Sequence, residues 1–277
     1  MEPGPATGEA GEGDPWPARV DSFHGGRFAV WQPDGWGYRS GLDAMLLAAC
    51  LPTETTGHIA DIGAGAGVVG LAAASRAANA EIMLVESRPE MACLAHRSLE
   101  LHENAAIGRR VQVVEVDIGA KRDEREAAGL YDASIDLVLT NPPFHPRDHR
   151  RPADPSRNAA LFGEGDVSLE RWLDVSAALL RPRGRLAMIC RADLLGEAIA
   201  AISRRLGDVR ILPVHTRHGA PASRVLIAGR RGSQAPLSLL PGIDLQSPDG
   251  AQTALAEEIS AGSATLPLLD SRPSRRA

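Results

Sequence analysis

The sequence predicts an α/β fold with one mostly parallel sheet, and three observations support this expectation. Short apolar runs alternate with helical patterns from residue 57 to residue 206, as they do in parallel sheets covered by helices. The first run passes directly into a glycine-rich loop, and later runs end on polar side chains. With 277 residues and 44% hydrophobic content, the chain can bury one large core, so we expect a single α/β domain.

The first apolar strand, expected to end at Ile62, leads into a loop that suits a nucleotide-like ligand. Glycines let the backbone approach a ligand closely, and the alanine-rich helix that follows offers unpaired N–H groups at its positive end. A dinucleotide fingerprint would use Gly65, Gly67 and Gly70, but it starts beyond the end of the strand. The alternative is a purely structural turn. The frame that begins at the strand end is Asp61-x-Gly63-x-Gly65-x-Gly67.

Two further apolar strands are expected to end on an acid. The run at 81–86 ends on Glu86, where a carboxylate can accept both hydroxyls of a ribose. The run at 111–117 ends on Asp117, which can accept a hydrogen bond from an adenine amino group. Each acid alone is more often a solvated strand end. Because parallel strands end at the same edge of a sheet, their joint placement beside the glycine loop predicts one binding crevice.

The fourth apolar run, at 135–140, stops at a stiff tetrapeptide. Proline cannot donate to a strand ladder and fixes its own φ. The Asn141 side-chain oxygen and the Pro142 carbonyl can accept both hydrogens of an amino group, while the Phe144 ring can stack on a flat ring system. The alternative is a plain strand-ending turn. The motif, which predicts a pocket for an exocyclic amine, is Asn141-Pro142-Pro143-Phe144.

Helical spacing and helix-ending residues place the remaining elements. Pro182 and Gly184 end one helix, and an apolar helix precedes the first sheet strand. The expected elements are helices at 42–51, 88–104, 168–181 and 192–206, a short helix or loop at 121–130, and strands at 185–191, 209–214 and 224–228.

The segment from Gln32 to Ala49, QPDGWGYRSGLDAMLLAA, completes a recognisable pattern. Together with the glycine loop, the strand-end acids and the Asn-Pro-Pro-Phe motif, it resembles the class I S-adenosylmethionine-dependent methyltransferases. Within that class it is most similar to the bacterial valine-tRNA adenine-N6 methyltransferase family, over residues 21–260. The resemblance implies a Rossmann-like, doubly wound sheet of seven strands, mostly parallel, with one antiparallel strand near the edge. The implied strand order is 3-2-1-4-5-7-6.

The resemblance also implies S-adenosylmethionine as cofactor, held by the glycine loop, the strand-end acids and Asn141. A lid segment at 20–56 is expected to cover it. Within this lid, Tyr38, Arg39 and Asp43 are candidates for contacting the methionine portion, with Arg39 suited to its carboxylate and Asp43 to its ammonium group. The alternative for this segment is a capping helix with tryptophans as packing anchors.

The implied activity is N-methylation of an exocyclic base amine in RNA, most specifically adenine N6 in tRNA. Direct displacement by a positioned amine requires neither a metal nor a nucleophilic side chain. Family members often have tyrosine where this chain has Phe144. Asn-Pro-Pro-Phe-His also resembles ribosomal RNA guanine-N2 methyltransferases, and a protein-glutamine N5 methyltransferase uses the same amine chemistry. A nucleotide-binding protein without catalysis would leave the motif at Asn141 unexplained.

The net charge of −5 argues against an RNA partner, because phosphate neutralisation supplies most non-specific affinity. However, four acids lie in residues 1–19, and a basic loop follows the Asn-Pro-Pro-Phe motif. Such a loop suits a phosphate backbone, although a flexible charged loop is an equal alternative. The arginines expected to contact RNA are Arg147, Arg150, Arg151 and Arg157.

Residues 1–19 are acidic and rich in glycine and proline, so we expect a disordered leader before a domain at 20–260 and a polar tail at 261–277. The chain contains neither a secretory signal pattern nor 18 consecutive apolar residues, so no membrane association is expected. Three widely spaced cysteines have neither disulfide nor metal-ligand spacing. We therefore expect a cytoplasmic, monomeric enzyme without a metal.

Overall fold

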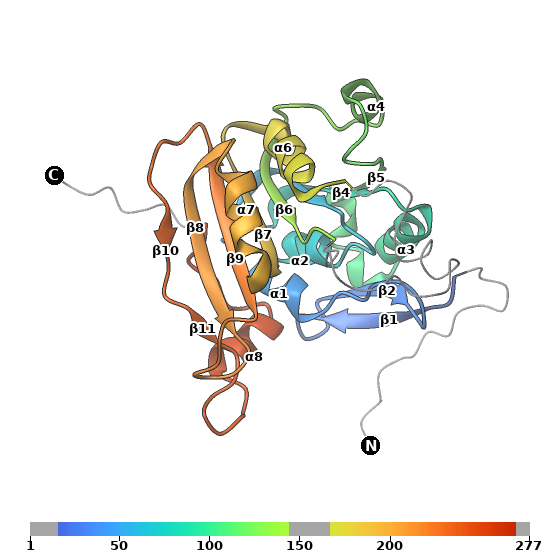
Figure 1. The fold of residues 1–277 in the computed structure, drawn as a ribbon. Coiled ribbons are helices and arrows are strands. Elements are labelled where there is room, and N and C mark those ends of the chain that lie inside the picture. Colours follow the sequence, from blue (N-terminus) through green and yellow to red (C-terminus); the bar gives the residue numbers. More distant parts are fainter. Residues whose placement is uncertain (1–15, 144–166, 270–277) are drawn as a thin grey trace, which may run out of the picture.

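The computed structural model describes residues 16–143 and 167–269. A central sheet lies between two layers of helices, with a small antiparallel hairpin beside it (Figure 1). The strands are β1 Ala18–Phe23, β2 Phe28–Pro33, β3 Thr56–Ile62, β4 Asn79–Glu86, β5 Val111–Glu115, β6 Ile135–Thr140, β7 Leu180–Arg191, β8 Leu206–His215, β9 Arg224–Arg231, β10 Ser238–Leu239 and β11 Ile243–Asp244. The helices are α1 Leu42–Ala49, α2 Val68–Arg76, α3 Pro89–Leu99, α4 Arg122–Ala127, α6 Leu169–Leu179, α7 Leu195–Ile202 and α8 Ala254–Ser260, with short 3₁₀ turns at His102–Asn104, Gly108–Arg110 and Ala192–Leu194.

The strands of the large sheet lie in the order β10-β8-β9-β7-β6-β3-β4-β5, and β11 also pairs with β8. Only β9 runs antiparallel to its neighbours, β7 and β8. The seven long strands therefore follow the expected order, with the expected antiparallel strand near one edge. The sheet has nine strands rather than seven, because β10 and β11 pair in parallel with the outer side of β8. Each has two residues, too few to produce a periodic signal in the sequence.

Each face of the sheet is buried under its own core. Side chains of successive strand residues point to opposite faces. In β6, Leu137 and Leu139 belong to the core under α1, α2, α3 and α8, while Val138 belongs to the core under α6 and α7. All three are 5% exposed or less. Strands covered on both faces are apolar throughout, which explains why they appear in the sequence as continuous hydrophobic runs.

The hairpin of β1 and β2 packs on the end of α3 through buried polar side chains. The Asn104 side chain accepts from the Ala29 N–H (3.0 Å) and donates to the Ala29 carbonyl (2.6 Å), replacing a strand neighbour for β2. The Ser98 hydroxyl accepts from the Trp31 N–H (2.9 Å). Strand pairing in the hairpin begins at Ala18, two residues before the expected domain boundary at residue 20.

The folded part also continues past residue 260, where the sequence suggested a polar tail. Ala264, Leu266 and Leu268 are buried in the core next to α1. The Leu266 N–H donates to the Ala49 carbonyl (2.7 Å). Apolar residues at every second position give this segment one buried face, a pattern too short to stand out against the arginine-rich residues that follow.

Candidate active site

The carboxyl ends of four parallel strands lie side by side. Ile62 of β3 pairs with Val85 of β4 on one side and with Thr140 of β6 on the other. Glu86 pairs with Glu115 of β5. The residues that follow these strand ends are therefore neighbours along one edge of the sheet, as expected for a ligand site in a doubly wound fold.

The loop after β3 approaches its surroundings too closely for side chains. Gly63 has φ +73°, and a Cβ there would lie 2.8 Å from Cη2 of Trp172. Gly67 has φ +92° and would place a Cβ 2.8 Å from Leu84. Both positions require glycine for their left-handed φ and for the available space. Because Gly67 is the N-cap of α2, the first N–H groups of this helix face the edge without helical partners.

Asp61 is 1% exposed, and its Oδ2 accepts from the Gly70 N–H (2.9 Å). The pKa of Asp61 is raised to about 7, mainly by burial; the Gly70 hydrogen bond lowers it, and the nearby Glu86 carboxylate contributes to the rise. The Asp61 carboxylate thus fixes the first turn of α2 behind the loop.

Glu86 is 7% exposed and accepts three backbone hydrogen bonds. Its Oε2 accepts from the Gly65 N–H (2.7 Å), and its Oε1 accepts from the N–H groups of Ser87 (3.0 Å) and Arg88 (2.9 Å). The carboxylate therefore fixes the glycine loop to the end of β4. Each oxygen has two lone pairs, so acceptor capacity is left for a ligand hydroxyl.

Asp117 lies beyond the end of β5, which stops at Glu115 rather than continuing to Asp117 as expected. Its side chain is exposed, and Oδ1 accepts from the Gly119 N–H (2.7 Å).

Thr140, the last residue of β6, and Trp172 of α6 connect β6 to the glycine loop. The Thr140 hydroxyl donates to the Ile62 carbonyl (2.8 Å) and accepts from Nε1 of Trp172 (3.0 Å). The same indole lies under Gly63. Asn141 follows Thr140 directly, half-buried, with Pro142 buried and Pro143 exposed. Phe144, Arg147, Arg150, Arg151 and Arg157 lie outside the described residues.

Tyr38 of the lid segment lies against Asn141. Desolvation and then the Asp43 carboxylate raise the pKa of Tyr38, and a side-chain hydrogen bond with Asn141 lowers it by less, so the net direction is upward. Tyr38 is 56% exposed, so a ligand can reach this pair.

The other two lid candidates already have charged partners. Oδ2 of Asp43 accepts from Nε of Arg224 (3.0 Å) at the start of β9. The Arg39 guanidinium pairs with Asp21 of β1. Gln32 also donates to Asp21 (2.7 Å). Contacts of Arg39 and Asp43 with a methionine carboxylate and ammonium stay predictions.

Two residues of this site carry no signal in the sequence. Arg224 opens β9, whose next residues form a continuous apolar run, and its partner Asp43 lies 181 residues away. Trp172 falls on the apolar stripe of α6 and resembles an ordinary core residue there. Only the folded arrangement brings them to the site.

Within residues 16–143 and 167–269, no cluster of three metal-ligating side chains is found. No helix in these ranges has the length and apolarity needed to cross a membrane.

Known proteins with similar sequences share most of this chain. A tRNA1(Val) (adenine(37)-N6)-methyltransferase from Bacteroides fragilis is 30% identical over 203 residues, 73% of this chain and 81% of that protein. The protein of the same name from Photorhabdus laumondii is 27% identical over 241 residues, 85% of this chain and 91% of its own length.

Solved structures agree with the fold. A protein described as a predicted O-methyltransferase, from Agrobacterium tumefaciens, is 34% identical, with a TM-score of 0.69 over 81% of this chain and 98% of that chain. The T. thermophilus 16S rRNA N2 G1207 methyltransferase, solved with AdoMet and guanosine, has a TM-score of 0.55 at 20% identity, over 83% of this chain and 52% of that chain. The model of the methyltransferase small domain matches residues 41–217. The chain therefore belongs to the methyltransferase small domain family.

Proposed function

We propose that this protein is an S-adenosylmethionine-dependent methyltransferase that methylates N6 of an adenine in tRNA. The observation that carries the proposal is the Asn141-Pro142-Pro143 turn at the end of β6, beside Tyr38 and the glycine loop. The family supports methyl transfer. The choice of adenine in tRNA is supported by relatives named for that reaction that match 73% or more of this chain.

The residues at the edge fit the cofactor. The cofactor supplies a methyl group on a positively charged sulfonium. A Cβ at Gly63 or Gly67 would lie 2.8 Å from Trp172 or Leu84, so only glycine lets the loop pack its backbone this closely on the edge of the sheet. The Glu86 carboxylate is positioned to accept from ribose hydroxyls, and Asp117 from the adenine amine, as the sequence suggests. The first N–H groups of α2 provide donors that the methionine carboxylate requires.

The chain's contribution to catalysis is to position a weak nucleophile. An exocyclic amine has its lone pair delocalised into the ring. Acceptance of its two N–H bonds by the Asn141 Oδ1 and the Pro142 carbonyl favours a pyramidal nitrogen whose lone pair points at the methyl group. Tyr38 lies beside Asn141, and in the proposed site its oxygen accepts from the Asn141 amide N–H, so that Oδ1 is left for the substrate. The buried Thr140–Trp172 pair holds this turn against the glycine loop.

The proposed reaction takes place in the cytoplasm with a monomeric enzyme. Cys50 and Cys190 are buried as free thiols, and Cys93 is also unpaired, which suits a reducing compartment. Size-exclusion chromatography with light scattering tests the monomer.

The deciding experiment is transfer of labelled methyl from S-adenosylmethionine to separated tRNA, ribosomal RNA and protein pools from cells that lack this gene. Each labelled pool is then digested and analysed by nucleoside or amino acid. We expect N6-methyladenosine in tRNA. N2-methylguanosine in ribosomal RNA, or methylglutamine in protein, would overturn the substrate assignment, and absence of transfer to every pool would overturn the activity.

A further inference from the structure

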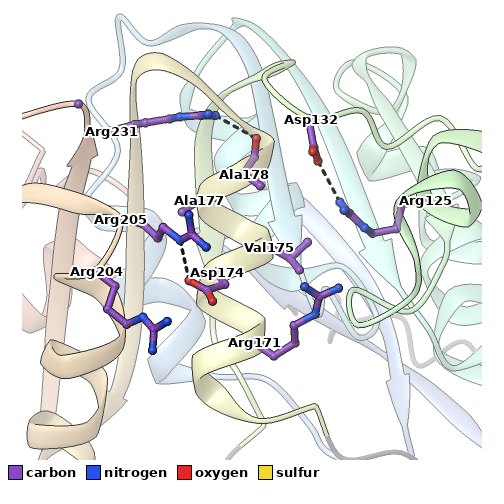
Figure 2. Close-up of a pocket in the computed structure, with 11 residues that line it drawn as sticks. Arg125, Asp132, Arg171, Asp174, Val175, Ala177, Ala178, Arg204, Arg205 and Arg231 are labelled. Carbon is purple, nitrogen blue, oxygen red and sulfur yellow. Dashed lines mark hydrogen bonds and ion pairs between the residues drawn. The ribbon is translucent and has the colours of Figure 1, made fainter.

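A cavity of about 580 Å³ lies against helix α6, away from the site described above (Figure 2). Five arginines and two aspartates are among its lining residues, an excess of three positive charges. Asp132, Ala178 and Gly232 lie near the amino ends of β6 and β7 and the carboxyl end of the antiparallel β9, so the cavity reaches the opposite edge of the sheet. Its arginines are Arg125, Arg171, Arg204, Arg205 and Arg231.

Three of these arginines are held in place by neighbours. Nε of Arg205 donates to Oδ1 of Asp174 (2.9 Å), and Nη1 of Arg231 donates to the Ala178 carbonyl (3.0 Å); Figure 2 shows both contacts. Arg204 pairs with Glu170. A guanidinium has five N–H donors, so these bonds orient the side chains and leave other donors for a ligand.

The other two arginines have unused donors. Arg125 is 4% exposed, and while its Nη1 donates to Asp132 (3.3 Å), its Nε has no hydrogen-bond partner within the described part of the chain. A buried donor without a partner costs stability that a ligand oxygen would restore. The exposed Arg171 side chain likewise forms no ion pair or hydrogen bond with a described residue. Both line the same cavity.

Helix α6 connects this cavity to the active site. Arg171 lines the cavity, and the next residue, Trp172, contacts Gly63 of the glycine loop and bonds to Thr140. From Arg171 to Ala178 the cavity follows the helix for roughly 10 Å, at about 1.5 Å per residue. If the target base sits at Asn141 and Pro142, the phosphates of the attached chain that follow α6 meet the arginines of the cavity.

We propose that this cavity is a binding site for phosphate groups. Guanidinium groups match phosphate oxygens in paired hydrogen bonds, and several of them around one hollow favour a polyanion over a single carboxylate. The source that fits the rest of the molecule is the phosphodiester backbone of the RNA substrate, and this choice of source rests on the proposed function. A free phosphate compound offers the same chemistry.

The test uses the full-length protein and the double variant Arg171→Ala/Arg204→Ala. The matched control is Arg27→Ala/Arg109→Ala, which removes two exposed arginines from other parts of the surface. Dissociation constants for unfractionated tRNA are measured by filter binding at several salt concentrations. Because each phosphate contact contributes about 0.7–0.9 to the slope of log K against log salt, we expect the cavity variant to lower this slope by about 1.5 and to bind roughly tenfold more weakly.

A second arm does not depend on RNA. Inorganic pyrophosphate is titrated into each protein in phosphate-free buffer, and the shift in melting temperature is recorded. Arg125→Gln is included, because it removes the positive charge of the buried guanidinium and keeps a polar side chain. Weaker tRNA binding in the cavity variant but not in the control supports RNA phosphates as the ligand. Unchanged tRNA binding, with pyrophosphate stabilising the wild type but neither cavity variant, supports a free phosphate compound. If neither ligand distinguishes the cavity variants from the control, the proposal is wrong.

Discussion

The carboxyl edge of the sheet and the arginine cavity use charge in opposite ways. At the edge, buried carboxylates accept hydrogen bonds from backbone N–H groups, as Glu86 does from Gly65 and Asp61 from Gly70. In the cavity, guanidinium groups are held mainly by side chains, as Arg205 is by Asp174. Backbone donors are fixed by strand register, whereas long side chains can change rotamer. The edge is therefore suited to exact positioning, and the cavity to an extended ligand with variable geometry.

From this difference we expect substitutions in the two regions to change different measured properties. Changes at the edge alter methyl transfer, cofactor affinity or stability and leave the salt dependence of RNA binding unchanged. Changes in the cavity alter the salt dependence of RNA binding and leave cofactor affinity and the chemical step unchanged. Variants at the edge, ordered from the largest expected effect, test that division.

Asn141→Ala removes the proposed acceptor for the substrate amine. We expect methyl transfer to fall at least tenfold, and by up to about 10³-fold, as found when one positioned polar group is lost from a catalytic site. Cofactor affinity, measured by calorimetry, should stay nearly unchanged. The control is Asn79→Ala at the exposed start of β4. Equal loss of cofactor binding in the Asn141 variant would show a structural role instead.

Asp61→Asn tests the raised pKa of the buried Asp61 carboxyl group behind the glycine loop. Burial raises the pKa of Asp61 to about 7 from an ordinary value of 3.8. The folded state therefore favours the protonated form, and the stability that this form contributes is complete below pH 4 and is lost as pH rises through 7. Asparagine stays neutral. From pH 4 to pH 8 we expect the unfolding free energy of the variant to rise relative to wild type by about 4 kcal/mol. Parallel denaturation curves across this range would contradict the assignment.

Glu86→Gln keeps the shape of the side chain but removes its charge and one acceptor oxygen. We expect S-adenosylmethionine to bind about tenfold more weakly, because charged acceptors form the stronger hydrogen bonds. Glu81→Gln, at an exposed position of the same strand, is the control for calorimetry. Unchanged affinity would remove Glu86 from the cofactor site and leave it as a brace for the loop.

Tyr38→Phe removes only the phenol oxygen, which in the proposed site accepts from the Asn141 amide. We expect kcat to fall about threefold with little change in KM, because the amide loses one neutral hydrogen bond that fixes its orientation. Tyr131→Phe, the same change at an exposed site between α4 and β6, is the control. A rise in KM with kcat unchanged would assign Tyr38 to substrate binding rather than to orientation.

The sequence predicted the parts of the fold that depend on local patterns. Buried parallel strands such as β6 are continuous apolar runs, and the polar residue after each run marks its carboxyl end. Those features also placed Asp61, Glu86 and Asn141 along one edge. The strand order came from family resemblance, because no local pattern determines which strands pair.

The sequence did not predict features that depend on contacts between distant residues. Arg224 has an unremarkable sequence context until folding brings it to Asp43. The cavity collects arginines from α4, α6, β9 and the segment after α7, in a chain whose arginines are spread throughout the sequence. The burial of Leu266 also depends on a partner distant in sequence, Ala49.

Arg76 has a consequence for how the protein is made. Its guanidinium donates to the Leu51 carbonyl (3.0 Å), the Gly262 carbonyl (2.7 Å) and the Thr265 hydroxyl (3.0 Å), and it is 6% exposed. Two of these acceptors are synthesised long after Arg76. On the ribosome, the first helices therefore hold a cation that lacks two of these three acceptors until residues 262–265 have emerged. We expect the amino-terminal half to become resistant to protease only after that point, which pulse proteolysis of stalled nascent chains would detect.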